Sequence, residues 1–152
     1  GEKMKKILVA VMAVLFFTGC GVADKSKVVR EDGSNEIVRY SIKDALNSPL
    51  AKEKLPSDIK FVFGASQGKV IKQGLVSNKK TNGVGKGDEE ACQRAFISAL
   101  ISFTNSAKKE NATKVVNLTS YFKKQEFKST TEYECAIGNI MTGVALKGDI
   151  AK

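Results

Sequence analysis

The segment from Asp88 to Lys109 constrains the fold most, because its apolar residues recur at helical spacing along one face. Acidic residues occupy its first turn and lysines its last turn, which complements the helix dipole at both ends. Asn111 follows as a candidate left-handed cap. The pattern predicts one long helix whose apolar face is formed by Cys92, Ala95, Phe96, Ala99, Leu100, Phe103 and Ala107.

Strand patterns lie on both sides of this helix. Residues 59–64 and 69–77 predict two strands that pair back as a hairpin, and residues 78–87 a basic, glycine-rich loop. After the helix, residues 114–122, 130–137 and 139–146 predict three more strands, the last of them central because it carries few charges. Ser41 and Ser48 are typical N-caps of short helical turns before Pro56. We expect an α+β fold, with one long helix packed on a mostly antiparallel β-sheet and a short N-terminal helical segment.

The start of the chain resembles a bacterial export signal. Met4-Lys5-Lys6 precedes an apolar run from Ile7 to Phe17, which is shorter than the about 20 residues that a membrane-spanning helix needs. Phe17-Thr18-Gly19-Cys20 resembles the lipobox of bacterial lipoproteins, in which the cysteine becomes the lipidated first residue. Gly21-Val22-Ala23 is the alternative cleavage site, of the ordinary secretory type.

Lipidation at Cys20 would anchor the protein to a membrane. By resemblance to Gram-negative lipoproteins, Gly21 after the cysteine implies an outer-membrane lipoprotein that faces the periplasm, whereas the alternative cleavage implies a soluble periplasmic protein. We therefore expect a lipoprotein-type signal peptide at residues 1–19, a flexible tether at residues 20–36 and a single α+β domain at residues 37–152.

Two cysteines remain after either cleavage. Helical spacing puts Cys92 on the apolar face of the long helix, and strand alternation puts Cys135 on the buried side of residues 130–137. In an oxidising compartment this pair predicts a disulfide, which closes a loop of about 44 residues and contributes about 4 kcal/mol in the chain-entropy model. The alternative is a reactive thiol at Cys92, activated by the helix N-terminus.

The net charge of +9 is compatible with contact to anionic lipids or other polyanions, but the explanation that we favour is a lysine-rich soluble surface. Aromatic and basic residues interleave at residues 121–128, where Lys123, Lys124 and Lys128 are candidates for a polyanion contact on a hairpin tip. Glu132 and Glu134 share one strand face, and we interpret them as ordinary surface acids.

The sequence contains no histidine, which excludes catalytic zinc sites built on histidine, histidine general bases and Ser-His-Asp triads. The glycines at residues 83–87 run into a helix that starts with three acids, which would repel a phosphate. No catalytic residue, metal site or cofactor is predicted.

Four segments carry a family resemblance: residues 89–96, 112–118, 134–136 and 143–148. They resemble a group of small exported proteobacterial proteins, some labelled "excinuclease ATPase subunit", and more distantly the YbjQ-like domain and the RcsF-like outer-membrane lipoproteins. In the RcsF-like proteins a helix cysteine is bridged to a strand cysteine, the positions of Cys92 and Cys135 here. The YbjQ-like resemblance implies homo-oligomers. The ATPase label itself requires a P-loop, and neither Gly68-Lys69 nor Gly85-Lys86 has its spacing.

Together these patterns predict a non-enzymatic envelope lipoprotein, an interaction or stress-sensing module. Its partner would be an envelope protein or an anionic lipid, and not a nucleic acid. The alternative is a periplasmic protein that cycles its thiols or binds a small ligand.

Overall fold

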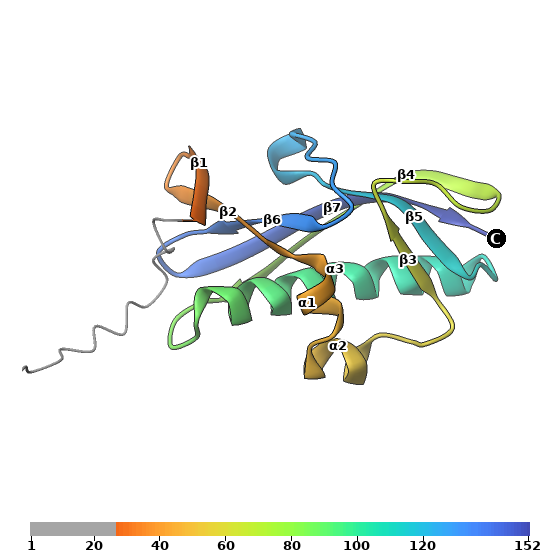
Figure 1. The fold of residues 1–152 in the computed structure, drawn as a ribbon, viewed down its shortest axis with the longest axis horizontal. Helices are drawn as coiled ribbons and strands as arrows, with labels where there is room; N and C mark the ends of the chain where they lie inside the picture. Colours follow the sequence, from red (N-terminus) through yellow and green to blue (C-terminus); the bar gives the residue numbers. More distant parts are fainter. Residues whose placement is uncertain (1–26) are drawn as a thin grey trace, which may run out of the picture.

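The computed structural model describes residues 27–152, which form one α+β layer pair (Figure 1). A seven-stranded, mostly antiparallel sheet lies on the long helix α3. The predicted fold class is confirmed at this level. The predicted signal peptide, Cys20 and both predicted cleavage sites lie outside the described residues.

Helix α3 spans Asp88–Lys109, and all seven residues of the predicted apolar face are buried. It ends as predicted, because Asn111 has φ 51° and the amide of Ala112 donates to the carbonyl of Ala107 at 2.9 Å. At the centre of the core the Phe96 ring stacks between Phe63 and Tyr133, with ring centroids 5.7 and 4.1 Å away. The helix therefore supplies the largest part of the core from one continuous face.

The sheet is organised around β7. One edge of β7 pairs with β4 along its length, and the other edge pairs first with β6 and then with β5. The β6 ladder is short, with only two residue pairs, Ala136 opposite Gly143 and Ile137 opposite Thr142. Strands β2 and β1 extend the sheet beyond β6, and β3 extends it beyond β5 as the one parallel pair. The strand bounds are β1 Val28–Asp32, β2 Asn35–Ser41, β3 Lys60–Phe63, β4 Val70–Asn82, β5 Lys114–Ser120, β6 Glu132–Ile137 and β7 Met141–Ala151.

Two short helices follow β2 and pack against α3. Helix α1 spans Ile42–Leu46, and the Ser41 side chain accepts from the amide of Asp44 at 3.1 Å. Helix α2 spans Pro49–Lys54, and Ser48 caps it in the same way. These caps fix where the chain turns away from β2 and place α1 beside β3.

The segment between β5 and β6 crosses the sheet on the face opposite α3, where it contains the 3-10 turn η2, Phe122–Lys124 (Figure 1). Both Lys123 and Lys124 have positive φ, 48° and 61°. The β5–β6 segment therefore covers part of this face, on which no long helix from residues 27–152 lies.

The predicted hairpin of residues 59–64 and 69–77 is wrong. Strand β3 lies parallel to β5, whereas β4 pairs with the edge of β7 that faces away from β5. Strand β4 also continues to Asn82, into the predicted loop. The connection crosses β5, since the Asn117 amide donates to the Ala65 carbonyl and Lys69 exchanges backbone hydrogen bonds with Lys152. The turn-forming residues Ser66-Gln67-Gly68 indicate that the chain turns there, but they do not determine which strand of the sheet the next strand pairs with.

The expected tether also needs correction. Residues 28–36 form β1, a turn at Gly33 and the start of β2, whereas we expected them to be flexible. Two contacts explain the order: Arg30 reaches Glu134, and Asp32 pairs with Lys123 at 2.7 Å. Polar composition predicted flexibility here, but long-range ion pairs fix the strand.

Candidate functional site

The predicted disulfide between Cys92 and Cys135 is present. It joins the first turns of α3 to the middle of β6, with Cα atoms 5.9 Å apart. Both cysteines are buried, at 0% and 1% exposure. The alternative of a reactive thiol at Cys92 is wrong, because its sulfur is bonded and inaccessible.

Glu134 corrects the interpretation of the paired acids. It is 1% exposed, on the sheet face opposite α3. Arg30 Nη1 donates to both of its carboxylate oxygens, at 2.7 and 2.6 Å, and Arg39 donates to one of them through Nε and Nη2 at 3.3 Å. A buried carboxylate needs such partners, because the loss of hydration is otherwise uncompensated. Glu132, two residues earlier, is exposed as predicted.

Other groups complete this polar cluster. Arg39 lies directly opposite Glu134 in the β2–β6 register, and its guanidinium stacks on the Phe127 ring 3.7 Å from the centroid. Ser120 accepts a hydrogen bond from the backbone amide of Glu134 at 2.9 Å. Sequence reasoning missed both arginines. Arg39 could have been found only by pairing its strand with the strand of Glu134, and no such pairing was predicted. Arg30 was missed because it lies in the segment that was expected to be a flexible tether. The cluster thus fastens β1, β2 and the β5–β6 segment together, which is a structural role.

Tyr133 is the one titratable group in the described residues with a strong resolved pKa shift. Burial raises the pKa of its phenol, and the negative charge of Glu89 adds to the effect. Its hydroxyl has no hydrogen-bond partner within residues 27–152. Tyr133 therefore stays neutral and belongs to the core rather than to a reactive site.

The three candidate lysines do not form one cluster of free charges. Lys123 pairs with Asp32, and its ammonium also lies 5.7 Å from the Phe122 ring centroid. Lys124 and Lys128 are exposed and flank the half-buried Phe127 segment. A polyanion contact at these residues stays a prediction.

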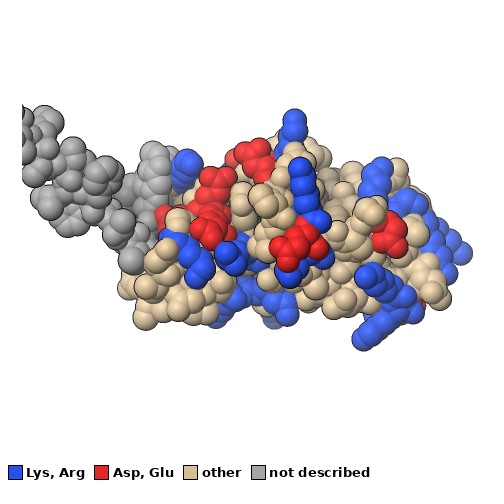
Figure 2. All heavy atoms as spheres, turned by 90° about the horizontal axis from the view of Figure 1, so that it is seen from below, with Lys and Arg blue, Asp and Glu red and all other residues tan. Residues whose placement is uncertain are grey.

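A second concentration of lysines lies where α3 ends. Figure 2 shows Lys and Arg side chains gathered at the end of the molecule away from the grey segment. The register explains the clustering, because Lys60 lies opposite Lys114 and Lys69 bonds to Lys152 through the backbone. Only Lys72 of this end has an ion pair within the described chain, with Glu110 at 3.9 Å. Much of the net positive charge is therefore separate from the predicted lysines at residues 123–128.

A hollow of about 560 Å³ lies between α1 and the outer edge of β3. Leu46, Phe61 and Phe63 form its apolar part, and Lys43 and Lys60 are its charged lining residues. Lys60 donates its amide to Thr113 of the β5 side, so strand alternation turns the backbone groups of Phe61 and Phe63 toward the hollow. We call this hollow the β3 groove. It combines an apolar wall with an open strand edge.

Residues 27–152 contain no group of three or more His, Cys, Asp or Glu side chains that could hold a metal ion. Nor is any helix in this range long and apolar enough to cross a membrane. No known family model, curated protein or solved structure matches the chain. The resemblance to YbjQ-like and RcsF-like proteins therefore stays a prediction, and function is argued from the residues alone.

We predict that Glu134→Ala destabilises the fold by about 2–3 kcal/mol, while Glu132→Ala changes the free energy of unfolding by less than about 0.5 kcal/mol. Removing the Glu134 carboxylate leaves the guanidinium groups of Arg30 and Arg39 close together without a counter-charge. Their partial exposure (29% and 34%) reduces the loss of unfolding free energy, because water solvates them in part. Urea unfolding of both variants measures the difference. Equal effects would show that the Glu134 cluster has no structural importance.

Proposed function

We propose that this chain is an exported, lipid-anchored and non-enzymatic interaction module of the bacterial cell envelope. Its N-terminal pattern supports export, and Cys20 would carry the lipid. The Cys92–Cys135 disulfide supports the same compartment, because structural disulfides persist where the environment is oxidising. A short N-terminal export segment followed by a cross-linked domain is consistent with a protein that works outside the cytoplasm.

The β3 groove is the observation that carries the interaction role. An extended segment of a partner can add to an open sheet edge through backbone hydrogen bonds, while side chains on alternate residues enter a neighbouring pocket. Lys43 and Lys60 line the groove, and no acidic residue between positions 27 and 152 does, which favours a partner segment with acidic side chains. The partner is therefore proposed to be an envelope protein that presents an extended, acidic segment.

Thiol cycling is not retained as the second candidate. Thiol–disulfide exchange requires that a thiolate reach a disulfide sulfur, and here both cysteines are at most 1% exposed. The other acid–base groups of the core support a structural role as well, since Glu134 is held by two arginines and Tyr133 is kept neutral by burial. These features favour binding over chemistry.

Intact mass tests export and anchoring. Protein isolated from the membrane fraction of its native cells is expected to begin at Cys20, to carry three acyl chains and to react with a thiol reagent at two positions only after reduction. An unacylated chain that begins at Asp24 would contradict the anchor. Alkylation without a reductant would contradict the disulfide.

Site-specific photo-crosslinking tests the groove. A photoreactive amino acid at Lys43 is expected to give a discrete adduct in native cells, whereas the same group at exposed Lys109, at the far end of α3, is not. Leu46→Glu should abolish the Lys43 adduct, because it adds a negative charge to the apolar wall of a groove that selects acidic segments. Equal adducts at both positions, or an adduct that Leu46→Glu leaves unchanged, would contradict the proposal.

A further inference from the structure

A second hollow, of about 420 Å³, lies on the sheet face opposite α3, between β4, β7, β6 and the η2 turn. Its floor is formed by Ala136 of β6 and Gly143 of β7, which face each other in register. Strand alternation puts both on the outer face, because Cys135, Ile137 and Val144 point into the core. Two small residues side by side leave a depression here, which we call the β6–β7 hollow.

The walls of the β6–β7 hollow are largely apolar. Phe122 comes from η2, and Met141, which is 44% exposed, comes from the start of β7. The stem of Lys80 forms the β4 side, since a Cβ added to Gly143 would lie 3.4 Å from Lys80 Cγ, at ordinary contact distance. A small ligand in this space would therefore meet hydrocarbon from Phe122, Met141 and the Lys80 stem, while the amides of Asn35 and Asn78 supply polar groups beside it.

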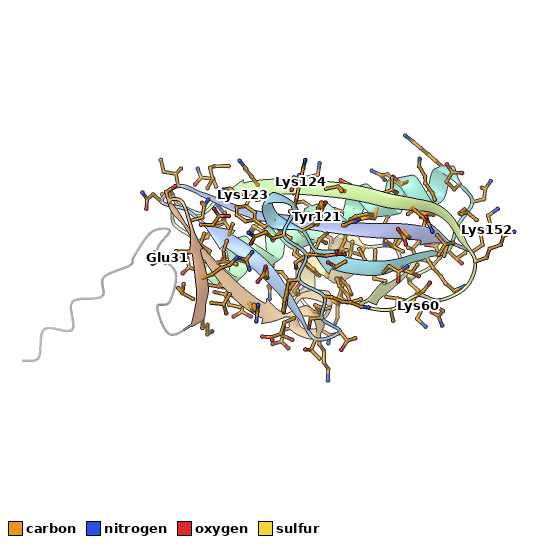
Figure 3. All side chains as sticks on the ribbon, turned by 90° about the horizontal axis from the view of Figure 1, so that it is seen from above. Glu31, Lys60, Tyr121, Lys123, Lys124 and Lys152 are labelled. Carbon is orange, nitrogen blue, oxygen red and sulfur yellow. A yellow bond between two sulfur atoms is a disulfide. The ribbon has the colours of Figure 1, made fainter. Side chains whose placement is uncertain are left out.

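The rim of the hollow is positively charged. Lys80 and Lys123 both line it, and none of the acidic residues that the structure describes does. Lys123 shares its charge with Asp32, while the Lys80 ammonium has no ion pair or hydrogen bond among the described residues. Figure 3 shows the η2 turn, with Lys123 and Lys124 labelled, lying over the sheet on this side of the molecule. One free ammonium and one shared ammonium thus border an apolar space.

We propose that the β6–β7 hollow binds a single-chain anionic amphiphile of the fatty-acid type. The carboxylate would pair with Lys80 at the rim, and the first part of the hydrocarbon chain would pack on Phe122, Met141 and the small floor. The volume lies within the usual range for small-molecule sites, about 300–1,000 Å³. A sugar phosphate would leave the apolar walls unused, and a neutral hydrocarbon would leave the Lys80 ammonium unpaired.

This inference goes beyond the proposed function, because it assigns a lipid-like ligand to a second site that shares no residue with the β3 groove. It relies on the envelope location only for where the ligand comes from. A free fatty acid and a membrane lipid present the same chemistry. The test uses the full chain with Cys20→Ser, which removes the acylation site, so that its outcome does not depend on the anchor.

Titration of this protein with dodecanoate, below the concentration at which it forms micelles, is expected to show one site. Lys80→Gln should weaken binding about threefold to fivefold at low ionic strength, as loss of a partly exposed ion pair does. Gly143→Val should weaken it by more than about tenfold, because added methyl groups occupy the floor. The matched controls Lys79→Gln and Lys124→Gln should bind like the parent, since neither lines the hollow.

Further measurements test the role of the charge, the source of the ligand and the folding of the variants. Dodecanol should bind more weakly than dodecanoate, and equal binding would overturn the role of Lys80. Co-sedimentation with vesicles of phosphatidylcholine and phosphatidylglycerol that Lys80→Gln weakens and Lys79→Gln does not would identify a membrane lipid as the source. Dodecanoate binding without such co-sedimentation would identify the free fatty acid. Circular dichroism and urea unfolding show whether the Gly143→Val variant folds. If it does not fold, the comparison of Lys80→Gln with Lys79→Gln tests the proposal. Absence of dodecanoate binding, or equal affinity in Lys80→Gln and Lys79→Gln, would overturn the proposal.

Discussion

The bond between Cys92 and Cys135 is the constraint on which the rest of the structure depends. Strands β1, β2 and β6 form a wing, and among residues 27–152 its ladder to the remaining sheet consists of two residue pairs between β6 and β7. One hydrogen bond from the Glu134 amide to the Ser120 side chain of β5 adds to this ladder. The disulfide fastens β6, the inner strand of this wing, to α3, which itself packs on β4 and β7. A short ladder contributes little by itself, because each residue ordered costs backbone entropy. The cross-link offsets that cost by restricting the unfolded chain.

Both proposed binding surfaces depend on how the wing is placed. The floor of the β6–β7 hollow is the junction itself, since Ala136 and Gly143 are one of its two pairs. The β3 groove lies between β3 and α1, and α1 follows directly from β2 of the wing. An oxidising compartment would therefore be needed both for stability and for correctly shaped binding surfaces. This connects the proposed export to the proposed function in physical terms.

Local patterns predicted what local physics determines. The periodicity of residues 88–109 was enough to predict α3, its bounds and its buried face. The disulfide was predicted from two remaining cysteines in an expected oxidising compartment, and their placement on apolar faces supported it. Strand partners were not predictable, because β3 and β4 join different edges of a sheet that forms only when distant segments meet. Glu134 was misread for the same reason. Alternation correctly placed it on the face away from the helix, but its burial depends on Arg30, 104 residues earlier in the chain.

Amide hydrogen exchange tests the central role of the disulfide most directly. In the Cys92→Ala/Cys135→Ala variant, amides of β2 and β6 should lose at least about tenfold more protection than amides of β5 and β7, because the wing opens locally while the remaining sheet and α3 stay packed. The wild-type chain and Cys20→Ser, which leaves the cross-link intact, provide the references. An equal loss of protection in all four strands, or no loss in β2 and β6, would contradict the account.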